Sequence, residues 1–538
     1  MEFIFLTKAK MKAHILFIFL ISTSVQLFAQ VDPWIIKAEN INASDYYGIT
    51  VANGMIGVVS SPQPLKVSSV IQSGTYDLYG RGRVSNFLNS FNLLNMQLDI
   101  NGRRMDAGSV MNFKQELDMR SATFAGSFDY ETDASVRYTY SALRHLPYCV
   151  LMEITITARK DITIQAACLL ETPDALRDVQ NYYNELDRPH TNICLLTSTA
   201  KSPTGKLQLC ASSTFIFEEE RLQEPRVVHE MWDNNMHLMK FSKTIRAGQT
   251  YTFCIVGTTL SSVHHEDPLN EAERLTIFAK LEGREKLTYL HRKAWDDLWK
   301  SDILIEGDDQ SRQDIHSMLY HLYSFAREGN SYSLSPMGLS GLGYNGHVFW
   351  DTEVWMFPVY LILHPEIARS LIEYRFERLE AARRNAFAHG YKGAMFPWES
   401  AGSGVEETPV WALTGPFEHH ITACVALAAW NYYCVIQDKV WLKEKGWPIL
   451  SSTADFWASR VERDGAGVCN INNVVAADEW AENVDNDAFT NGAAIENLQG
   501  AIAAAGILGY TPNPDWKLVA ENIPILSFDD GTTREHAS

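Results

Sequence analysis

The first half of the chain is patterned for β-strands. Between about residues 34 and 260, short segments alternate apolar with polar positions, and Gly, Asn, Asp and Pro interrupt them. These segments include SVRYTYSAL, CVLMEITITAR, DITIQAACLL, KLQLCASSTFIF and QTYTFCIVGTTL. Side chains of a strand point alternately to its two faces, so this period of two predicts a large antiparallel β-sandwich.

A change to helical spacing follows at residues 266–300. Apolar positions there recur every three or four residues, which places them on one side of a helix. They are Leu275, Phe278 and Leu281, continued by Leu287, Leu290 and Trp295. We therefore predict a β-sandwich domain over residues 30–265 and a helical linker over residues 266–304.

The remaining residues, 305–538, are predicted to form a helical domain. Helical patterning recurs in the segments 311–328, 351–363, 366–388, 417–437, 448–462, 490–507 and 514–522. Long loops rich in Gly, Ser and Trp join them, whereas helices in ordinary bundles are joined by about 2–8 residues. We therefore favour an α/α toroid, whose loops gather at one end and build a pocket, over a simple bundle. An odd number of helices cannot close a ring of hairpins, so the barrel is expected to be truncated at the C-terminus.

The first residues resemble an export signal. Lysines at positions 8, 10 and 12 precede an apolar run that stops at Ala29, the pattern of a secretory signal peptide over residues 1–29. A membrane anchor is the weaker interpretation, because the run of about 17 residues is shorter than the roughly 20 needed to cross a bilayer. We expect a periplasmic or secreted protein, with Met11 as the true start and no membrane segment in the mature chain.

Charge and cysteine content narrow the possible partners. The formal net charge is −19 and no Lys/Arg cluster is present, which argues against binding of nucleic acid or anionic lipid. A neutral or cationic partner fits better. The eight cysteines lack a CxxC pair and lie mostly in apolar runs, so buried free thiols are favoured over a disulfide framework, although one bridge stays open.

Three loops combine aromatic side chains with carboxylates or amides. They are GLGYNGHVFWDTEVW (341–355), GAMFPWESAGSGVEETP (393–409) and VVAADEWAENVDNDAFTNGAA (474–494). An aromatic face can stack on the apolar surface of a sugar ring while a carboxylate binds its hydroxyls, and Trp350–Asp351 and Trp398–Glu399 supply both. The structural alternative makes both tryptophans core residues and Asp351 the N-cap of helix 352–363.

Glu479 is the candidate general acid. It lies between Asp478 and Trp480, so we expect it to be part-buried against the indole with a like charge beside it. Both effects raise the pKa of a carboxyl group and suit it to donate a proton near neutral pH. The alternative is a solvated acidic turn, which we expect of Glu482 and Asp485.

Histidines and acidic spacing do not predict a metal or cofactor. His419 and His420 are adjacent, not four residues apart as a helical metal site requires. We expect them, with His347, to contact the sugar; the alternative for His419 and His420 is one cap and one buried partner. A calcium loop beginning at Asp485 fails because Phe489 and Thr490 occupy the positions that need an oxygen ligand and glycine.

The motifs together resemble glycoside hydrolase family 65. The resemblance rests on GHVFWDTEVWMFP, GAMFPWES, EHHITACVALAAW and ADEWAENVDNDAFTN, preceded by YYGITVANGMIG, and runs from about residue 40 to the end. It implies a β-super-sandwich, a helical linker and an (α/α)6 barrel. It also implies that Glu479 is the general acid, that Trp350 and Asp351 bind the donor sugar, and that Trp398 and Glu399 lie near the donor and acceptor sugars.

The family contains inverting α-glucoside phosphorylases and a smaller set of hydrolases. The resemblance places the phosphate loop or the hydrolytic base beyond Ser538, so no base is assigned here. Because export makes a sugar phosphate a less useful product, we favour an inverting hydrolase of a short α-linked glucoside such as kojibiose, without cofactor. An α-glucoside phosphorylase is the alternative, and a catalytically incomplete carbohydrate-binding fragment is a second. The sequence chooses neither the linkage nor the oligomeric state.

Overall fold

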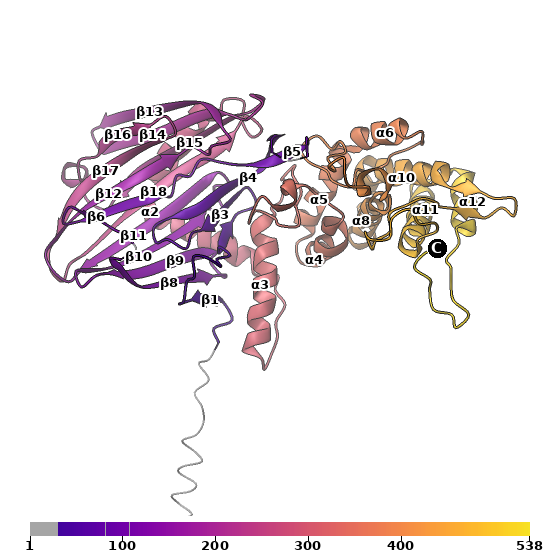
Figure 1. Cartoon of the computed structure of the whole chain (residues 1–538), viewed down its shortest axis with the longest axis horizontal. Coiled ribbons are helices and arrows are strands. Elements are labelled where there is room, and N and C mark those ends of the chain that lie inside the picture. The colour runs from indigo at the N-terminus through magenta and orange to yellow at the C-terminus, as the bar shows by residue number, and fades with distance from the viewer. Residues whose placement is uncertain (1–30, 81, 107) are drawn as a thin grey trace, which may run out of the picture.

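The computed structural model describes residues 31–80, 82–106 and 108–538. The predicted signal peptide lies outside these residues. Figure 1 shows the strands gathered at one end of the molecule and most helices at the other, with α3 (Asp309–Phe325) between them. The predicted fold class, an antiparallel β-domain followed by a helical region, is confirmed.

The β-domain contains antiparallel sheets only, within the described residues. The largest follows the order β1-β8-β9-β10-β11-β18-β15-β14-β13, and the next β16-β17-β12-β6-β7. The strands of the first are β1 Ile35–Ala38, β8 Val110–Asp118, β9 Thr123–Tyr130, β10 Ala134–Ala142, β11 Cys149–Ala158, β13 Arg177–Arg188, β14 Thr191–Lys201, β15 Gln208–Phe217 and β18 Thr250–Ser261. Those of the second are β6 Met96–Ile100, β7 Arg103–Arg104, β12 Ile162–Glu171, β16 Val228–Asp233 and β17 Met236–Ile245, and a short helix, η1 Arg221–Gln223, precedes β16.

A third sheet points toward the helical region. Its strands are β2 Thr50–Ala52, β3 Ile56–Ser60, β4 Val67–Leu78 and β5 Ser85–Asn89, paired in that order. In Figure 1 the hairpin of β4 and β5 extends from the β-domain to the first helices of the helical region. This hairpin reaches the candidate site described below.

The predicted linker helix is covered by the β-domain. α2 (Pro268–Leu298) bends at Gly283, where φ is +77°, and packs on the nine-stranded sheet. The predicted apolar side was partly wrong, because Phe278 and Leu281 are exposed. Leu287 and Trp295 are buried as predicted. Ala272, Thr276 and Ala279 are buried in the first half of the helix, where their small side chains let it approach the strands.

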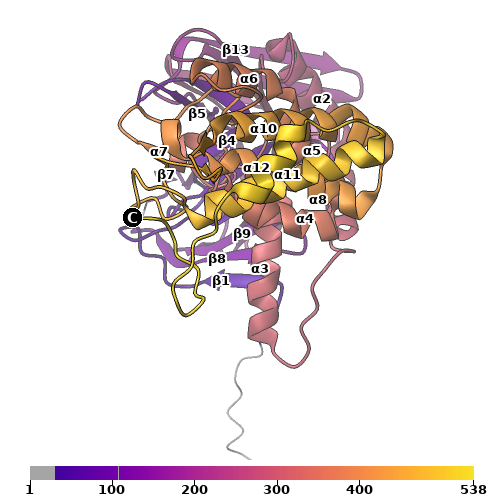
Figure 2. The same cartoon turned by 90° about the vertical axis from the view of Figure 1, so that its right-hand side faces the viewer.

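The helical region matches the predicted segments closely. The helices are α4 Phe357–Leu363, α5 Pro365–Glu377, α6 Leu379–Ala388, α7 Thr414–Phe417, α8 His420–Ile436, α9 Lys439–Trp441, α10 Trp447–Arg460, α11 Ala488–Leu508 and α12 Pro514–Asn522. Short elements complete it: η2 Gly343–Gly346, the π-helical turns η3 Thr352–Met356 and η4 Leu442–Gly446, and strands β19 Glu462–Arg463 and β20 Cys469–Asn470. Figure 2, viewed from this end, shows α8, α10, α11 and α12 together in front of the sheets. The predicted helix 366–388 is divided at Arg378 into α5 and α6.

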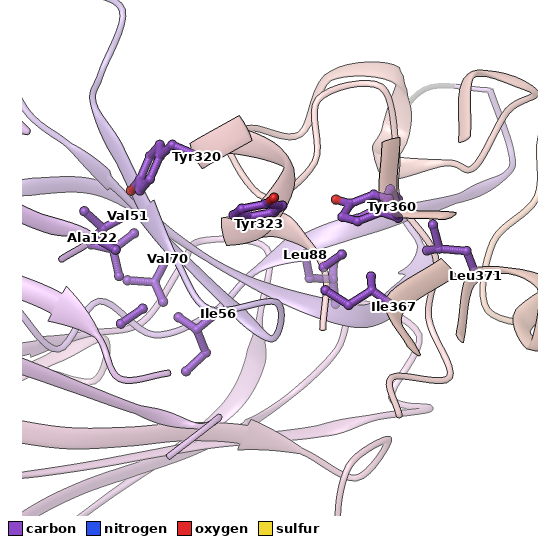
Figure 3. Packing of buried hydrophobic residues seen from close by; sticks show 14 of the residues in the cluster. Val51, Ile56, Val70, Leu88, Ala122, Tyr320, Tyr323, Tyr360, Ile367 and Leu371 are labelled. Atoms are coloured by element: carbon purple, nitrogen blue, oxygen red, sulfur yellow. The ribbon is translucent and has the colours of Figure 1, made fainter. Parts of the chain in front are cut away.

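One hydrophobic core crosses the boundary between the two halves. Tyr320 of α3 lies beside Val51 and Ala122 of the β-domain, and Tyr323 and Tyr360 continue the contact toward Ile367 and Leu371 (Figure 3). The predicted free thiols are confirmed for the described chain, and all but Cys434 are buried. Within the described residues, no helix is both long enough and apolar enough to cross a membrane.

Candidate active site

Two of the predicted loops are hydrogen-bonded to each other. The amide of Val348 donates to the Ser400 carbonyl at 2.7 Å, and the amide of Ser400 donates to the Val348 carbonyl at 3.0 Å. This bridge places Trp350–Asp351 beside Trp398–Glu399, although Asp351 and Trp398 are 47 positions apart in the sequence. The folded chain therefore brings the two pairs together.

An aromatic cluster joins these loops to the third. The ring of His420 lies 4.6 Å from that of Trp350, 5.4 Å from that of Trp398 and 5.0 Å from that of Phe489, between ring centroids. Trp350 is half-buried and keeps surface for a sugar ring. Trp398 is only 3% exposed, so its predicted role as a sugar platform is wrong; it supports the cluster from inside.

Three carboxyl groups converge beside this cluster. The pKa of Glu479 is raised, first by burial of its carboxyl group and then by the negative charges of Asp351 and Glu399. Burial also raises the pKa of Asp351. Because both charges act on Glu479, its carboxyl group lies within electrostatic range of the two tryptophan loops.

Burial and like charge raise the pKa of Glu479 as predicted, but the groups predicted to cause this were wrong. Trp480 is 95% exposed and does not cover the carboxyl group, and the residue Glu479 is itself exposed, so only its carboxyl group is partly desolvated. Asp478 accepts a hydrogen bond from the Trp480 amide at 3.1 Å and shapes the turn. The like charges that act on Glu479 come from Asp351 and Glu399, two other loops, and adjacency in sequence could not reveal them.

Asp351 does not cap the helix that follows it. The alternative in which it caps the following helix is not observed, because its side chain makes no capping hydrogen bond and its own backbone is helical. The next residues form the π-helical turn η3, and such turns are often found at functional sites. A carboxylate whose hydrogen bond is to its own backbone amide keeps acceptor positions for sugar hydroxyls.

His347 contacts Glu399. The prediction that it contacts the sugar is wrong. It is fully buried, with Nδ1 2.7 Å from Glu399 Oε2 and Nε2 2.6 Å from the Ser85 carbonyl oxygen. A carbonyl only accepts, so Nε2 carries hydrogen, and the contact of Nδ1 with the carboxyl oxygen then needs one further proton between them. Both ring nitrogens are therefore engaged behind the site.

His419 and His420 are also buried, so their predicted sugar contact is wrong. His419 Nε2 contacts the Pro416 carbonyl at 2.8 Å and its Nδ1 accepts from Arg460 at 3.1 Å. Burial lowers the pKa of each ring to about 3, so both are neutral at ordinary pH. The alternative of a buried partner was the better prediction for His420.

Sequence reasoning missed Glu418, a buried carboxyl group on which the charge of the candidate acid acts. Its Oε1 is 2.9 Å from His420 Nε2, and its side chain is fully buried. Burial, followed by the charges of Glu479 and Asp487, raises the pKa of Glu418 to about 10. A lone carboxylate within the motif EHHITACVALAAW, before an otherwise apolar helix, was the available signal.

Two further missed groups order the Trp398 loop. Glu406 accepts hydrogen bonds from the amides of Trp398 at 2.9 Å and Thr408 at 3.0 Å. From the β-domain, the Ser85 amide donates to Glu407 at 2.9 Å, and the Tyr76 hydroxyl donates to the Gly346 carbonyl at 2.6 Å. The β4–β5 hairpin thus forms one wall of the site.

Comparisons with known proteins match this architecture. The family model described as glycosyl hydrolase family 65, N-terminal domain, matches residues 49–298, and the model of the family 65 central catalytic domain matches residues 316–520. A solved structure titled putative kojibiose phosphorylase from human microbiome has a TM-score of 0.80 with 18% identity, covering 94% of this chain and 72% of that one. At this identity the likeness concerns the fold.

Several relatives are similar in sequence over nearly the whole chain. The kojibiose hydrolase of Mucilaginibacter mallensis is 67% identical over 507 residues, which cover 94% of this chain and 75% of that protein. The kojibiose hydrolase of Flavobacterium johnsoniae is 56% identical over 98% of this chain and 77% of its own. The kojibiose phosphorylase of Escherichia coli is 28% identical over 85% of this chain and 63% of its own. With two domain models and these similarities, the chain belongs to glycosyl hydrolase family 65.

Proposed function

We propose that the protein hydrolyses a short α-linked glucoside, with kojibiose as the first candidate and Glu479 as the general acid. The observation that carries this proposal is the convergence of Glu479 with Asp351 and Glu399 beside the half-buried Trp350. The 67% and 56% identity to kojibiose hydrolases supports hydrolysis over phosphorolysis, because the phosphorylase with comparable coverage is far less similar.

The chemistry follows from the protonation of these groups. A raised pKa increases the fraction of Glu479 that is protonated at a given pH, and the protonated carboxyl group can give its proton to the glycosidic oxygen as the bond breaks. Asp351 binds hydroxyls of the donor glucose, and Trp350 stacks on its apolar face. In an inverting hydrolase, a second carboxylate about 6.5–9.5 Å from the acid activates water on the opposite face; we assign that role to none of the described residues.

Product analysis tests the proposal. The purified protein is incubated with kojibiose, with and without inorganic phosphate, and glucose and glucose 1-phosphate are measured. We expect two glucose molecules per disaccharide and no dependence on phosphate. Glucose 1-phosphate would support the phosphorylase, and sugar binding without turnover would support a carbohydrate-binding role. Parallel assays with nigerose and trehalose identify the linkage.

We also propose that the protein is periplasmic or secreted. The support is the lysine-flanked apolar run before Ala29 in the sequence. Expression of the full-length chain in a Gram-negative host, followed by fractionation and N-terminal mass analysis, checks this. A protein that stays in the cytoplasm with residues 11–29 intact would contradict it.

A further inference from the structure

A buried arginine contacts the chain on both sides of the two residues proposed to bind the donor sugar. Arg375 of α5 is 1% exposed and forms a two-point ion pair with Glu353, with Nε–Oε1 at 2.6 Å and Nη2–Oε2 at 3.0 Å. Its Nη2 also donates to the Phe349 carbonyl at 3.1 Å. Phe349 immediately precedes Trp350, and Glu353 follows Asp351 by two residues. One guanidinium therefore holds both ends of the segment 349–353.

This segment needs an anchor because its backbone leaves the ordinary helical pattern. Residues Thr352–Met356 form a π-helical turn, closed by the Phe357 amide donating to the Thr352 carbonyl. A π-turn inserts an extra residue and changes the direction in which the preceding side chains project. Asp351 makes no capping bond that would fix it, so its direction depends on the backbone on either side.

We propose that Arg375 and Glu353 are positioning residues of the donor subsite, which act by fixing Trp350 and Asp351. The proposal rests on the proposed function for the identity of that subsite. The planar guanidinium suits this role, because its rigid fork pairs with the carboxylate at two points and still donates to the carbonyl, whereas an ammonium group lacks the fork geometry. Neither residue reaches the sugar, since both are buried behind the loop.

The same pair could serve stability alone, and one double variant separates the two roles. Removing one partner leaves a buried charge and destabilises the fold, whereas replacing both by apolar residues of similar volume is often neutral or stabilising. The variant Arg375→Met/Glu353→Leu should therefore fold while the Phe349 carbonyl loses its donor. Arg144→Met is the matched control. Arg144 is also buried, and it donates a hydrogen bond of 2.8 Å to the carbonyl of Tyr323, which lies outside the catalytic loops.

The readouts are the melting temperature, the glucose Kd, and kcat and KM for kojibiose. We expect the double variant to melt near the wild type but to bind glucose at least about tenfold more weakly, with KM raised more than kcat is lowered. Arg144→Met should lose thermal stability and keep its glucose Kd. A folded double variant with Kd and kcat/KM within twofold of the wild type would overturn the proposal.

Two additions keep the outcome decisive. If the double variant does not fold, Arg375→Lys replaces it, and an unchanged glucose Kd in that variant counts against the proposal. Labelling with 5-fluorotryptophan gives a readout without substrate: the Trp350 signal, assigned with Trp350→Phe, should shift in the double variant and not in Arg144→Met. A wild type that cleaves no kojibiose contradicts the proposed function only, since the Trp350 signal still decides the role of Arg375.

Discussion

At the scale of single residues, the raised pKa of Glu479 makes the sharpest prediction. Glu479→Gln removes the proton donor while keeping size and polarity, so kcat should fall by about 10²–10⁴ while the glucose Kd stays within a few-fold. Because the acidic form is the active one, wild-type kcat/KM should decline as pH rises through the raised pKa of Glu479. Steady-state kinetics across pH 4–9 measure both. A Glu479→Gln enzyme with near wild-type kcat would disprove the assignment.

Glu418 gives a second prediction, this time for stability. Its pKa is about 10 in the folded protein and near 4.3 in an unfolded chain, so the folded state holds a proton that the unfolded state loses between these values. The free energy of unfolding contributed by this group is therefore full below about pH 4.3 and falls as pH rises toward 10. Glu418→Gln mimics the neutral acid and should show a shallower loss of melting temperature between pH 5 and 9, by at least about 2 °C. If the melting temperatures of the wild type and Glu418→Gln fall equally with pH, Glu418 is ionised in the folded protein.

At the scale of elements, periodicity predicted the strands and helices but not the contacts between distant ones. The spacing of apolar residues predicted α12 and α10, because a helix that buries one face has apolar residues at helical spacing. The break at Arg378 does not, since the pattern continues across it. The wall formed by the β4–β5 hairpin joins residues about 260–320 positions apart, and the charges that act on Glu479 come from separate loops. Only the folded chain brings such groups together.

The hairpin wall leads to a prediction about His347. Its ring links the Ser85 carbonyl to Glu399, so His347→Gln should let Glu399 move and lower kcat/KM by about 10–10², the scale that small misplacements cost. His364→Gln is the matched control, since His364 also bridges a carbonyl, Leu298, and a glutamate, Glu366, far from the site. Kinetics and melting curves compare the two variants. Equal losses of kcat/KM in both would mean that His347 contributes only to stability.

At the scale of the whole molecule, the continuous core of Figure 3 predicts that the β-domain and the helical region unfold together. Ten of the fourteen tryptophans follow residue 305, so tryptophan fluorescence reports mainly on the helical region, whereas circular dichroism near 218 nm includes the β-domain. Both signals should give one coincident thermal transition. Tyr320→Ala, which removes a buried ring and its hydrogen bond to the Thr50 carbonyl, should cost about 3–5 kcal/mol and lower both midpoints equally. Two transitions, of which the variant shifts only one, would show that each half is stable by itself and that the hairpin wall depends on docking of two independent domains.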